Sequence, residues 1–527
     1  MKQSTKAILD QRSDLRTYLY IYGFLLTNYK QVDLEAFPFY GMWRTIALDG
    51  EYCIYAHPKT QVEVVERHGR YFVMMGHAFD PYHQLHSEED ILNRLADAYG
   101  TNDYRDAIDS LTGLFVYAVL HNGTIEFEVD ATGLQLACHA QLADCFMIAS
   151  HAQILGDLFE DLTMCDIVRR LVNYKWYYRL KGTYLPCDLT PYAEVLRLIP
   201  DIAYYYDGEK VTHKRIFPLE EVDTAYTEEA YNAVIDEGSF VLKNSMKLIA
   251  KKWENPYISL TGGVDSNTAF AAANGEYDRF GTFTYVSCPK EEIDAEAARK
   301  IADRFGVKHR RIDIPESVEA LTDYDHYVQI MKHNSGFVTK RFDNEYRKRV
   351  FLIHHLNEVD IEVKSWSSEA IRGYFYTHFE RKKLPHCTPK VYRNLYKLFF
   401  ANRSLARAID KLFAGYMEKY EYDRIPDSLI YEMFYTEVSM GSWGAQNLAE
   451  MRMYSELTSI FNNRKFLRVM FRTPIEKRIA NQNHLDMKRQ MNPELYDLNI
   501  RVINKNETKM RAKLLNMVFT LNNWLPF

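Results

Sequence analysis

The sequence YISLTGGVDS, residues 257–266, reads as a short buried strand that turns through two glycines into a helix. Glycines let the backbone bend sharply and approach a ligand closely, because no Cβ stands in the way. The helix that follows begins with free N–H groups and the positive end of its dipole, which attract phosphate. Thr261 and Ser266 add hydroxyl donors, and Asp265 is placed to hold a Mg²⁺ that bridges phosphate oxygens. The stretch predicts a phosphate or pyrophosphate site; a tight turn without a ligand is the alternative.

Strands and helices alternate on both sides of this turn. A long helix is expected over residues 228–252. Strands are expected over 256–260, 281–287 and 308–314, with helices over 266–275 and 294–306. This alternation predicts an α/β domain whose parallel sheet is covered on both faces, with ligands at the carboxyl ends of the strands. The turn has neither the lysine of a P-loop nor the GxGxxG spacing of a dinucleotide fold, so neither is implied.

The first part of the chain has a different sequence pattern. From Gly41 to Ala152 it reads as short strands rich in Val, Ile, Tyr and Phe, with helical stretches interleaved. Asn122-Gly123 is a strong hairpin signal, because both residues tolerate positive φ. This pattern predicts an α+β domain with stacked antiparallel sheets. The pattern loosens near residues 215–228, so the domains are expected at 1–220 and 221–527.

Composition narrows the function classes. The 527 residues carry 65 basic and 71 acidic side chains, a formal net charge of −6. No positive excess is available to pair with nucleic-acid phosphates, so nucleic acid is not an expected partner. Residues 1–15 are polar and no apolar run could span a bilayer, so no membrane partner is expected. Seven cysteines without a CxxC pair make no disulfide framework or zinc ribbon, which predicts a cytoplasmic location.

The glycine turn resembles the pyrophosphate loop (PP-loop) of the ATP-pyrophosphatase superfamily, usually Ser-Gly-Gly-x-Asp-Ser, with Thr261 in place of the first serine. The acidic stretch 291–296 and the residues up to His309 are similar to the segment that marks the asparagine synthetase branch. Residues 283–286 stand where that family's strand contacts adenine, and residues 464–474 resemble its late helix near the active site. The resemblance implies that ATP is held by Leu260, Thr261, Gly262, Gly263, Asp265, Ser266, Val286 and Ser365.

The N-terminal part fits the same family. Residues 111–115 and the turn Asp130-Ala131-Thr132-Gly133 resemble its glutaminase domain, which is of the Ntn-hydrolase type. In working class II glutaminases the nucleophile is a cysteine at position 2, whose own α-amine serves as base once it is freed. Here position 2 is Lys2 and the first cysteine is Cys53. We therefore expect a glutaminase-like domain that does not hydrolyse glutamine.

A second loop of the family, Ser-Gly-x-Gly-x-Asp-Glu, binds metal, and its counterpart here is KSWSSEAIRGY, residues 364–374. Glu369 is the carboxylate available to complete a Mg²⁺ site with Asp265, although it is one methylene longer than the family's Asp or one position off. Arg372 is a candidate to neutralise phosphate or carboxylate charge. The alternative is a plain helix start, in which serines cap and Glu369 favours the dipole.

Later catalytic groups leave a weaker signal. Within residues 478–491 the family places a lysine that stabilises developing negative charge, and Lys488 is our candidate. Arg489 and His484 also qualify, and a solvated helix face explains all three. Glu437 is a candidate general base, with a helix cap or a surface ion pair as the alternative.

The resemblance implies an ATP- and Mg²⁺-dependent ligase that forms an amide. A carboxylate is adenylated with release of pyrophosphate, and ammonia or an amine then displaces AMP, without glutamine hydrolysis. β-Lactam synthetases and lasso-peptide cyclases have a similar plan and use an amine of the substrate itself. One rival is a nucleotide-activating enzyme of tRNA bases, which a tRNA-dependent activity would reveal; another is a non-catalytic binding protein, which ATP·Mg²⁺ calorimetry would reveal. A small-molecule or peptide carboxylate is the expected substrate, and a homodimer is left open.

Overall fold

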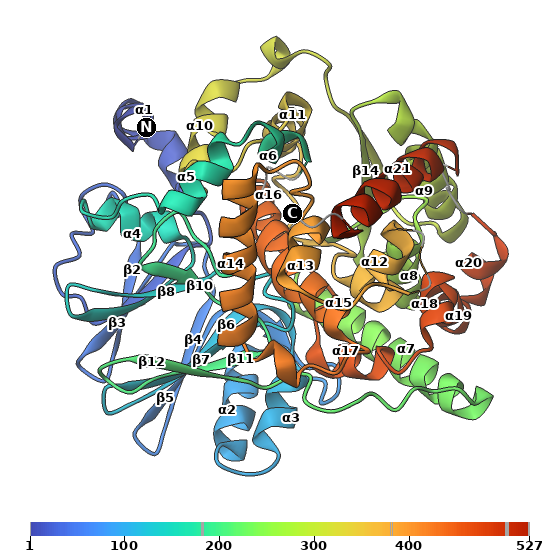
Figure 1. The fold of residues 1–527 in the computed structure, drawn as a ribbon, viewed down its shortest axis with the longest axis horizontal. Coiled ribbons are helices and arrows are strands. Elements are labelled where there is room, and N and C mark those ends of the chain that lie inside the picture. The colour runs from blue at the N-terminus through green and yellow to red at the C-terminus, as the bar shows by residue number, and fades with distance from the viewer. Residues whose placement is uncertain (1, 181–183, 380, 382, 501–504, 525–527) are drawn as a thin grey trace.

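Three β-sheets organise the computed structural model, which describes residues 2–180, 184–379, 381, 383–500 and 505–524 (Figure 1). Two are six-stranded and antiparallel and come from the N-terminal part of the chain; the third is five-stranded and parallel. The antiparallel strands are β1 (Phe24–Thr27), β2 (Arg44–Leu48), β3 (Tyr52–Ala56), β4 (Val62–Arg67), β5 (Arg70–Phe79), β6 (Thr112–His121), β7 (Thr124–Val129), β8 (Cys138–Leu142), β9 (Cys145–Ala149), β10 (Val195–Arg197), β11 (Ile202–Tyr206) and β12 (Val211–Arg215). The parallel strands are β13 (Pro256–Ser259), β14 (Gly281–Val286), β15 (His309–Asp313), β16 (Ile361–Val363) and β17 (Glu456–Thr458).

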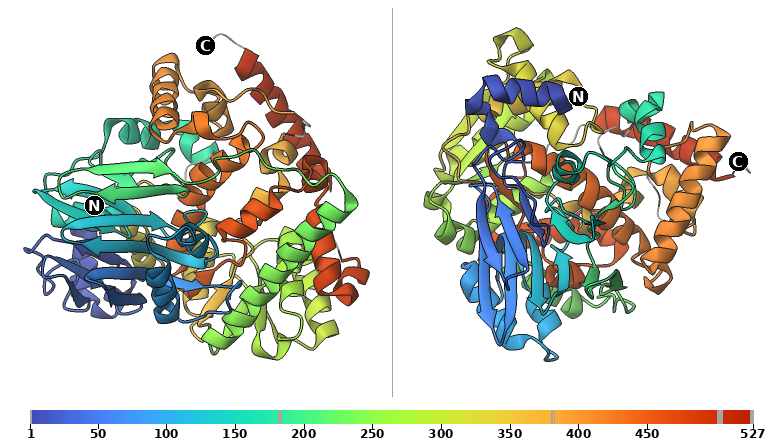
Figure 2. Two further views of the ribbon diagram at one scale, coloured as in Figure 1. Left: turned by 90° about the horizontal axis from the view of Figure 1, so that it is seen from below. Right: turned by 90° about the vertical axis from the view of Figure 1, so that its left-hand side faces the viewer.

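The two antiparallel sheets pack face to face, as predicted (Figure 2). Their orders are β10-β8-β9-β1-β3-β2 and β12-β11-β7-β6-β5-β4. Phe127 on β7 and Phe146 on β9 meet across the layer with ring centroids 5.5 Å apart. The predicted hairpin joins β6 to β7, where Asn122 and Gly123 have φ values of 49° and 77°. Positive φ at both positions suits a tight turn between antiparallel strands.

Helices cover the sheets. In the N-terminal part they are α1 (Lys2–Gln11), α2 (Glu88–Ala98), α3 (Tyr104–Asp109), α4 (Ala152–Leu158), α5 (Asp166–Asn173) and α6 (Lys175–Leu180). In the C-terminal part they are α7 (Glu228–Lys252), α8 (Val264–Ala272), α9 (Glu292–Phe305), α10 (Tyr324–Asn334), α11 (Asp343–Ile353), α12 (Tyr374–His378), α13 (Pro389–Leu395), α14 (Arg403–Lys419), α15 (Ile430–Phe434), α16 (Ala445–Met451), α17 (Arg464–Met470), α18 (Ile475–Ile479), α19 (Gln482–Met491), α20 (Pro493–Asp497) and α21 (Lys505–Trp524). No helix among the described residues combines the length and the apolar character that crossing a bilayer demands.

The parallel sheet has the order β15-β14-β13-β16-β17, with the glycine turn between β13 and α8 at its centre. The predicted α/β class is confirmed, and α7 begins and ends where the sequence pattern places it. Thr227 caps α7 by accepting the Ala230 N–H, and lysines close its last turn. Two strands were not predicted: β16 and β17 have three residues each, so no periodic pattern marks them.

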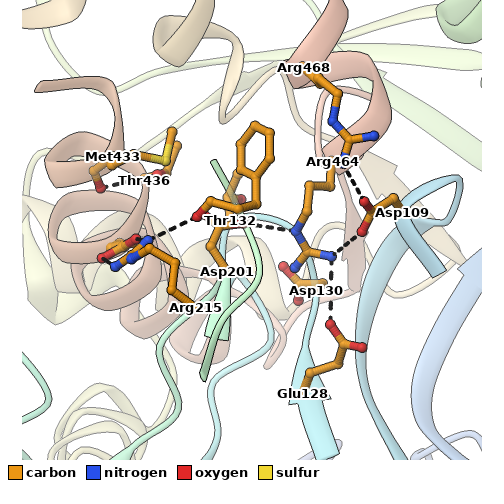
Figure 3. A network of polar contacts seen from close by, with 12 residues as sticks. Asp109, Glu128, Asp130, Thr132, Asp201, Arg215, Met433, Thr436, Arg464 and Arg468 are labelled. Carbon is orange, nitrogen blue, oxygen red and sulfur yellow. Dashed lines mark hydrogen bonds and ion pairs between the residues drawn. The ribbon is translucent and has the colours of Figure 1, made fainter. Parts of the chain in front are cut away.

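A buried arginine joins the two parts of the chain (Figure 3). Arg464, at the start of α17, donates to Asp201 at 2.8 Å and to Asp109 at 3.0 Å. Glu128 on β7 lies 3.7 Å from the same guanidinium, and Arg468 donates to the other oxygen of Asp109 at 2.6 Å. A buried guanidinium is costly unless it is paired, and here carboxylates compensate it, so this cluster fixes how the N-terminal sheets meet α17.

Candidate active site

The turn between β13 and α8 is held by its own polar groups. The hydroxyls of Thr261 and Ser266 lie 2.8 Å apart, and the Gly263 N–H donates to Thr261 Oγ1 at 3.1 Å. Asn267 donates its side-chain amide to the carbonyls of Thr261 and Gly263, at 2.9 and 2.7 Å. No side chain caps the start of α8 at Gly263. The turn is therefore preformed, and the first N–H groups of α8 are left for a ligand.

A pocket with a cavity volume of about 280 Å³ lies against this turn. This volume is close to the lower end of the range for small-ligand sites. Among the predicted residues, its lining contains Leu260, Thr261, Gly263, Asp265, Ser266, Ser365 and Glu369. Gly262 and Val286 are not in the lining: the Gly262 N–H donates to Asp294 at 3.0 Å, and Val286 is buried at the end of β14. Phe283, Thr284 and Tyr285 of the same strand take the place expected of Val286.

Asp265 is the meeting point of three segments. Ser368 donates to its Oδ1 at 2.7 Å, and Arg372 donates to its Oδ2 at 2.5 Å. His484 of α19 brings Nε2 within 3.5 Å of Oδ1. Burial lowers the pKa of His484 to about 4, so the imidazole is neutral at pH 7. The structure thus joins the predicted Asp265 and Arg372, adds Ser368, and brings in His484, which also qualified from the sequence.

Glu369 lies on the same side of the pocket, in the short helix η5 (Ser368–Arg372). Burial and the nearby charge of Asp265 raise the pKa of Glu369 to about 7. Its Oε2 is buried and has no hydrogen-bond partner. Two carboxylates that repel each other, one with an unused oxygen, fit a cation between them.

This donor set suits Mg²⁺ rather than a metal held by protein groups alone. No group of three His, Cys, Asp or Glu side chains in the described part of the chain could hold a metal. Mg²⁺ is commonly bound by one or two carboxylates together with substrate phosphates, which matches Asp265 and Glu369 beside the glycine turn.

Three further residues of the pocket were not predicted as site residues. Lys364 is buried in the lining with Nζ 2.5 Å from Glu362 Oε1, and Tyr454 donates to the other oxygen of Glu362 at 3.1 Å. Asp294 and Glu291 line the pocket from the start of α9 and the turn before it. Their spacing of three residues in the acidic stretch 291–296 was the available signal, because such residues share a helix face.

Lys488 does not reach the pocket lining. It is buried on α19, and its ammonium lies 5.7 Å from the ring centre of Tyr496. His484, one turn earlier on the same helix, faces Asp265 instead. Of the three groups considered in this segment, the histidine is the one beside the carboxylate.

Glu437 needs a correction, because its environment leaves no room for a general base. It lies in the π-helix η7 (Tyr435–Gly444) and is fully buried. Arg215 donates to Oε1 at 2.6 Å, while Tyr416 and Tyr422 donate to Oε2 at 3.2 and 2.7 Å. With both oxygens occupied and the pocket elsewhere, we assign Glu437 to a structural ion pair.

Comparison with known proteins bears on this site. The family model described as asparagine synthase matches residues 242–341, which contain β13, the glycine turn, α8, β14 and α9. Residues 242–341 are therefore similar to the asparagine synthase family. The match ends before the second loop, so the departures at residues 364–374 lie outside it. No curated protein matches the chain.

Solved structures share only a distant likeness. One is a glutamine phosphoribosylpyrophosphate amidotransferase from B. subtilis complexed with ADP and GMP: 11% identity, 56% of this chain, 62% of that one, TM-score 0.21. Another is a glutamine-dependent NAD⁺ synthetase from Acinetobacter baumannii in complex with ADP: 11% identity, 46% and 56% coverage, TM-score 0.21. An allosteric regulatory enzyme of purine biosynthesis aligns at 9% identity over 62% and 90%, with a TM-score of 0.23. The chain thus spans less than two thirds of the first two proteins.

Proposed function

We propose that this protein joins a carboxylate to ammonia or an amine, using ATP·Mg²⁺ and releasing AMP and pyrophosphate. The observation that carries the proposal is the Asp265–Glu369 pair, which lies beside a preformed glycine turn at the carboxyl edge of the parallel sheet. That edge is where open α/β sheets bind nucleotides. The match of residues 242–341 to the asparagine synthase family supports an ATP-dependent, amide-forming ligase in general.

The residues of the pocket divide the work of the first step. The N–H groups at the start of α8, with the hydroxyls of Thr261 and Ser266, would hold the β- and γ-phosphates. Asp265 and Glu369 would hold Mg²⁺, which neutralises phosphate charge when bound. Lys364 adds a buried cation on the pocket wall. A carboxylate oxygen of the substrate attacks the α-phosphorus, the bond to the β-phosphate breaks, and pyrophosphate leaves with the electron pair.

In the second step, the nitrogen of ammonia or an amine attacks the acyl carbon and AMP leaves. His484 lies beside Asp265 as a neutral imidazole, with Nε2 3.5 Å from Oδ1, and adds no charge there. We propose that glutamine is not the nitrogen source and that residues 1–220 form a separate, non-hydrolysing domain. We also propose that the protein acts in the cytoplasm.

The test has two stages. Isothermal calorimetry of the whole protein with ATP, with and without MgCl₂, measures whether the site binds nucleotide in a metal-dependent way. ATP–pyrophosphate exchange across a panel of carboxylates then tests adenylation, and product masses distinguish ammonia, an added amine or an internal amine. Absence of Mg²⁺-dependent ATP binding would favour a non-catalytic binding protein instead.

A further inference from the structure

The second loop of the site has an unusual backbone. Ser367 has φ 72° and ψ −12°, a left-handed conformation that a residue with a Cβ rarely adopts. It is fully buried, and it immediately precedes Ser368 and Glu369, the residues that face Asp265. A strained conformation of this kind persists only where the surroundings hold it. The position of Glu369 therefore depends on whatever holds Ser367.

The group that holds Ser367 comes from the N-terminal part of the chain. Thr132, in the turn after β7, places Oγ1 2.9 Å from Ser367 Oγ, although 235 positions separate the two residues. Thr132 also contacts Asn462: its N–H and its Oγ1 each lie 2.9 Å from Asn462 Oδ1. All three side chains are fully buried.

The hydrogen-bond directions follow from the chemistry of Asn462. Its Nδ2 donates to the Gly113 carbonyl at 2.7 Å and to Asp130 at 2.8 Å, so its Oδ1 is the acceptor on the other side. Because an amide oxygen cannot donate, Thr132 must give its hydroxyl proton to Asn462. The Thr132 oxygen is then free to accept from Ser367. The chain of donors runs from the loop, through Thr132, to Asn462.

We propose that Thr132 is a positioning residue for the nucleotide site, through which the N-terminal part aims the second loop. Thr132 fixes Ser367, Ser367 sets the start of η5, and η5 presents Ser368 and Glu369 to Asp265. This inference rests on the proposed function only in its effect on Mg²⁺. The effect on the loop itself does not depend on any ligand.

The test uses Thr132→Val, which removes the hydroxyl at nearly constant shape. The hydroxyl hydrogen bonds to Ser367 and to Asn462 are lost, while the Thr132 N–H still donates to Asn462 and keeps the turn attached there. We expect faster hydrogen–deuterium exchange in peptides covering residues 364–373, and a roughly tenfold higher Mg²⁺ concentration for half-maximal ATP binding. Thr132→Ser restores the hydroxyl and should restore both readouts.

Thr112→Val is the matched control. Thr112 is also a fully buried threonine that accepts across the same interface, from Asn463 Nδ2 at 3.0 Å, but it does not touch the second loop. Both readouts should stay at their wild-type values in Thr112→Val. If Thr132→Val does not fold, Ser367→Ala removes the same hydrogen bond from the loop side and should give the same two effects.

Wild-type hydrogen–deuterium exchange in residues 364–373 of Thr132→Val or of Ser367→Ala would overturn the proposal. So would a Thr112→Val protein with the same change, because a general loosening of the interface would then explain it. If the wild-type protein binds no ATP, the proposed function fails, yet the exchange comparison still decides the role of Thr132.

Discussion

Arg372 donates to Asp265 at 2.5 Å, so a guanidinium from the second loop holds the carboxylate that opens α8. Arg372 is itself fixed, because its Nε donates to Asn481 Oδ1 at 2.7 Å just before α19 begins. Two loops that lie 107 positions apart in the sequence thus meet at one carboxylate. The geometry aims Asp265 into the pocket before any nucleotide arrives, which is how a preorganised site lowers the cost of binding.

Replacing Asp265 by asparagine should remove Mg²⁺-dependent ATP binding. The change keeps the shape of the side chain but removes its charge, and we expect the affinity to fall at least about 100-fold. Calorimetry with ATP and MgCl₂ measures the effect. Asp278→Asn, at an exposed position in η2 (Tyr277–Arg279), is the control and should bind as the wild type does. Equal affinities for the two variants would remove Asp265 from the metal site.

Glu369→Gln should stabilise the protein while impairing the site. Glutamine removes the repulsion from Asp265 and the cost of burying a charge, both of which raise the pKa of Glu369. At pH 8 we expect the free energy of unfolding to rise by about 1 kcal/mol, measured by urea denaturation without ligand. ATP binding should lose its Mg²⁺ dependence. A variant that keeps the wild-type Mg²⁺ dependence would support the plain helix start.

Replacing Lys364 or Lys488 by methionine should have different effects on the affinity for ATP. Lys364 lines the pocket, so its loss should weaken ATP binding roughly tenfold. Lys488 lies outside the lining, so its loss should change the ATP dissociation constant by no more than about twofold. The same calorimetric titration measures both. If Lys488→Met instead abolishes pyrophosphate exchange, the assignment made from the sequence is the right one.

Glu437→Gln should destabilise the fold without altering the nucleotide site. The fully buried Arg215 would lose the charge that compensates it, which costs about 3–5 kcal/mol of unfolding free energy. Chemical denaturation measures this loss, and the folded fraction should bind ATP normally. The double variant Arg215→Met with Glu437→Met should cost less than either single change. A stable Glu437→Gln protein without pyrophosphate exchange would restore the general-base role.

Buried histidines should make the protein acid-sensitive. Burial lowers the pKa of His139 and of His151 to about 3, against about 6.5 in an unfolded chain. Below pH 6.5 the unfolded chain binds protons that the folded protein does not, so stability falls as the pH falls. At pH 5 the loss is about 2 kcal/mol for each histidine.

Urea midpoints between pH 7.5 and pH 5 measure this loss. His139→Phe should reduce it, because His139 packs among the rings of Phe127, Phe146 and Tyr204. His86→Gln, at an exposed position, should leave the pH dependence unchanged. A pH profile of His139→Phe that matches the wild type would show that other groups govern the acid response.

The sequence predicts the elements whose cause is local. The ends of α7 follow from Thr227 and from the terminal lysines, and the β6–β7 hairpin follows from Asn122-Gly123. β16 and β17 could not be predicted, because three residues form a strand only when a neighbouring strand is already in place. Local pattern has no access to that neighbour.

The candidate site divides in the same way. The glycine turn is a single segment, so the sequence alone identifies Thr261, Gly263 and Asp265. Lys364 lines the pocket and His484 lies beside Asp265, and both come from parts of the chain that only tertiary packing brings there. Glu437 misled the sequence interpretation because a carboxylate on a helix looks the same whether it faces a ligand or a buried arginine.

Arg464 has a consequence for anyone who wishes to rebuild this chain from parts. Its guanidinium pairs with Asp109, Glu128 and Asp201 at once, so the three acids of the N-terminal part and the arginine at the start of α17 depend on one another. A chimaera that took residues 1–220 from a relative without these three acids would bury an uncompensated cation. The N-terminal part is thus not an interchangeable module, and any graft has to carry the three acids together with Arg464.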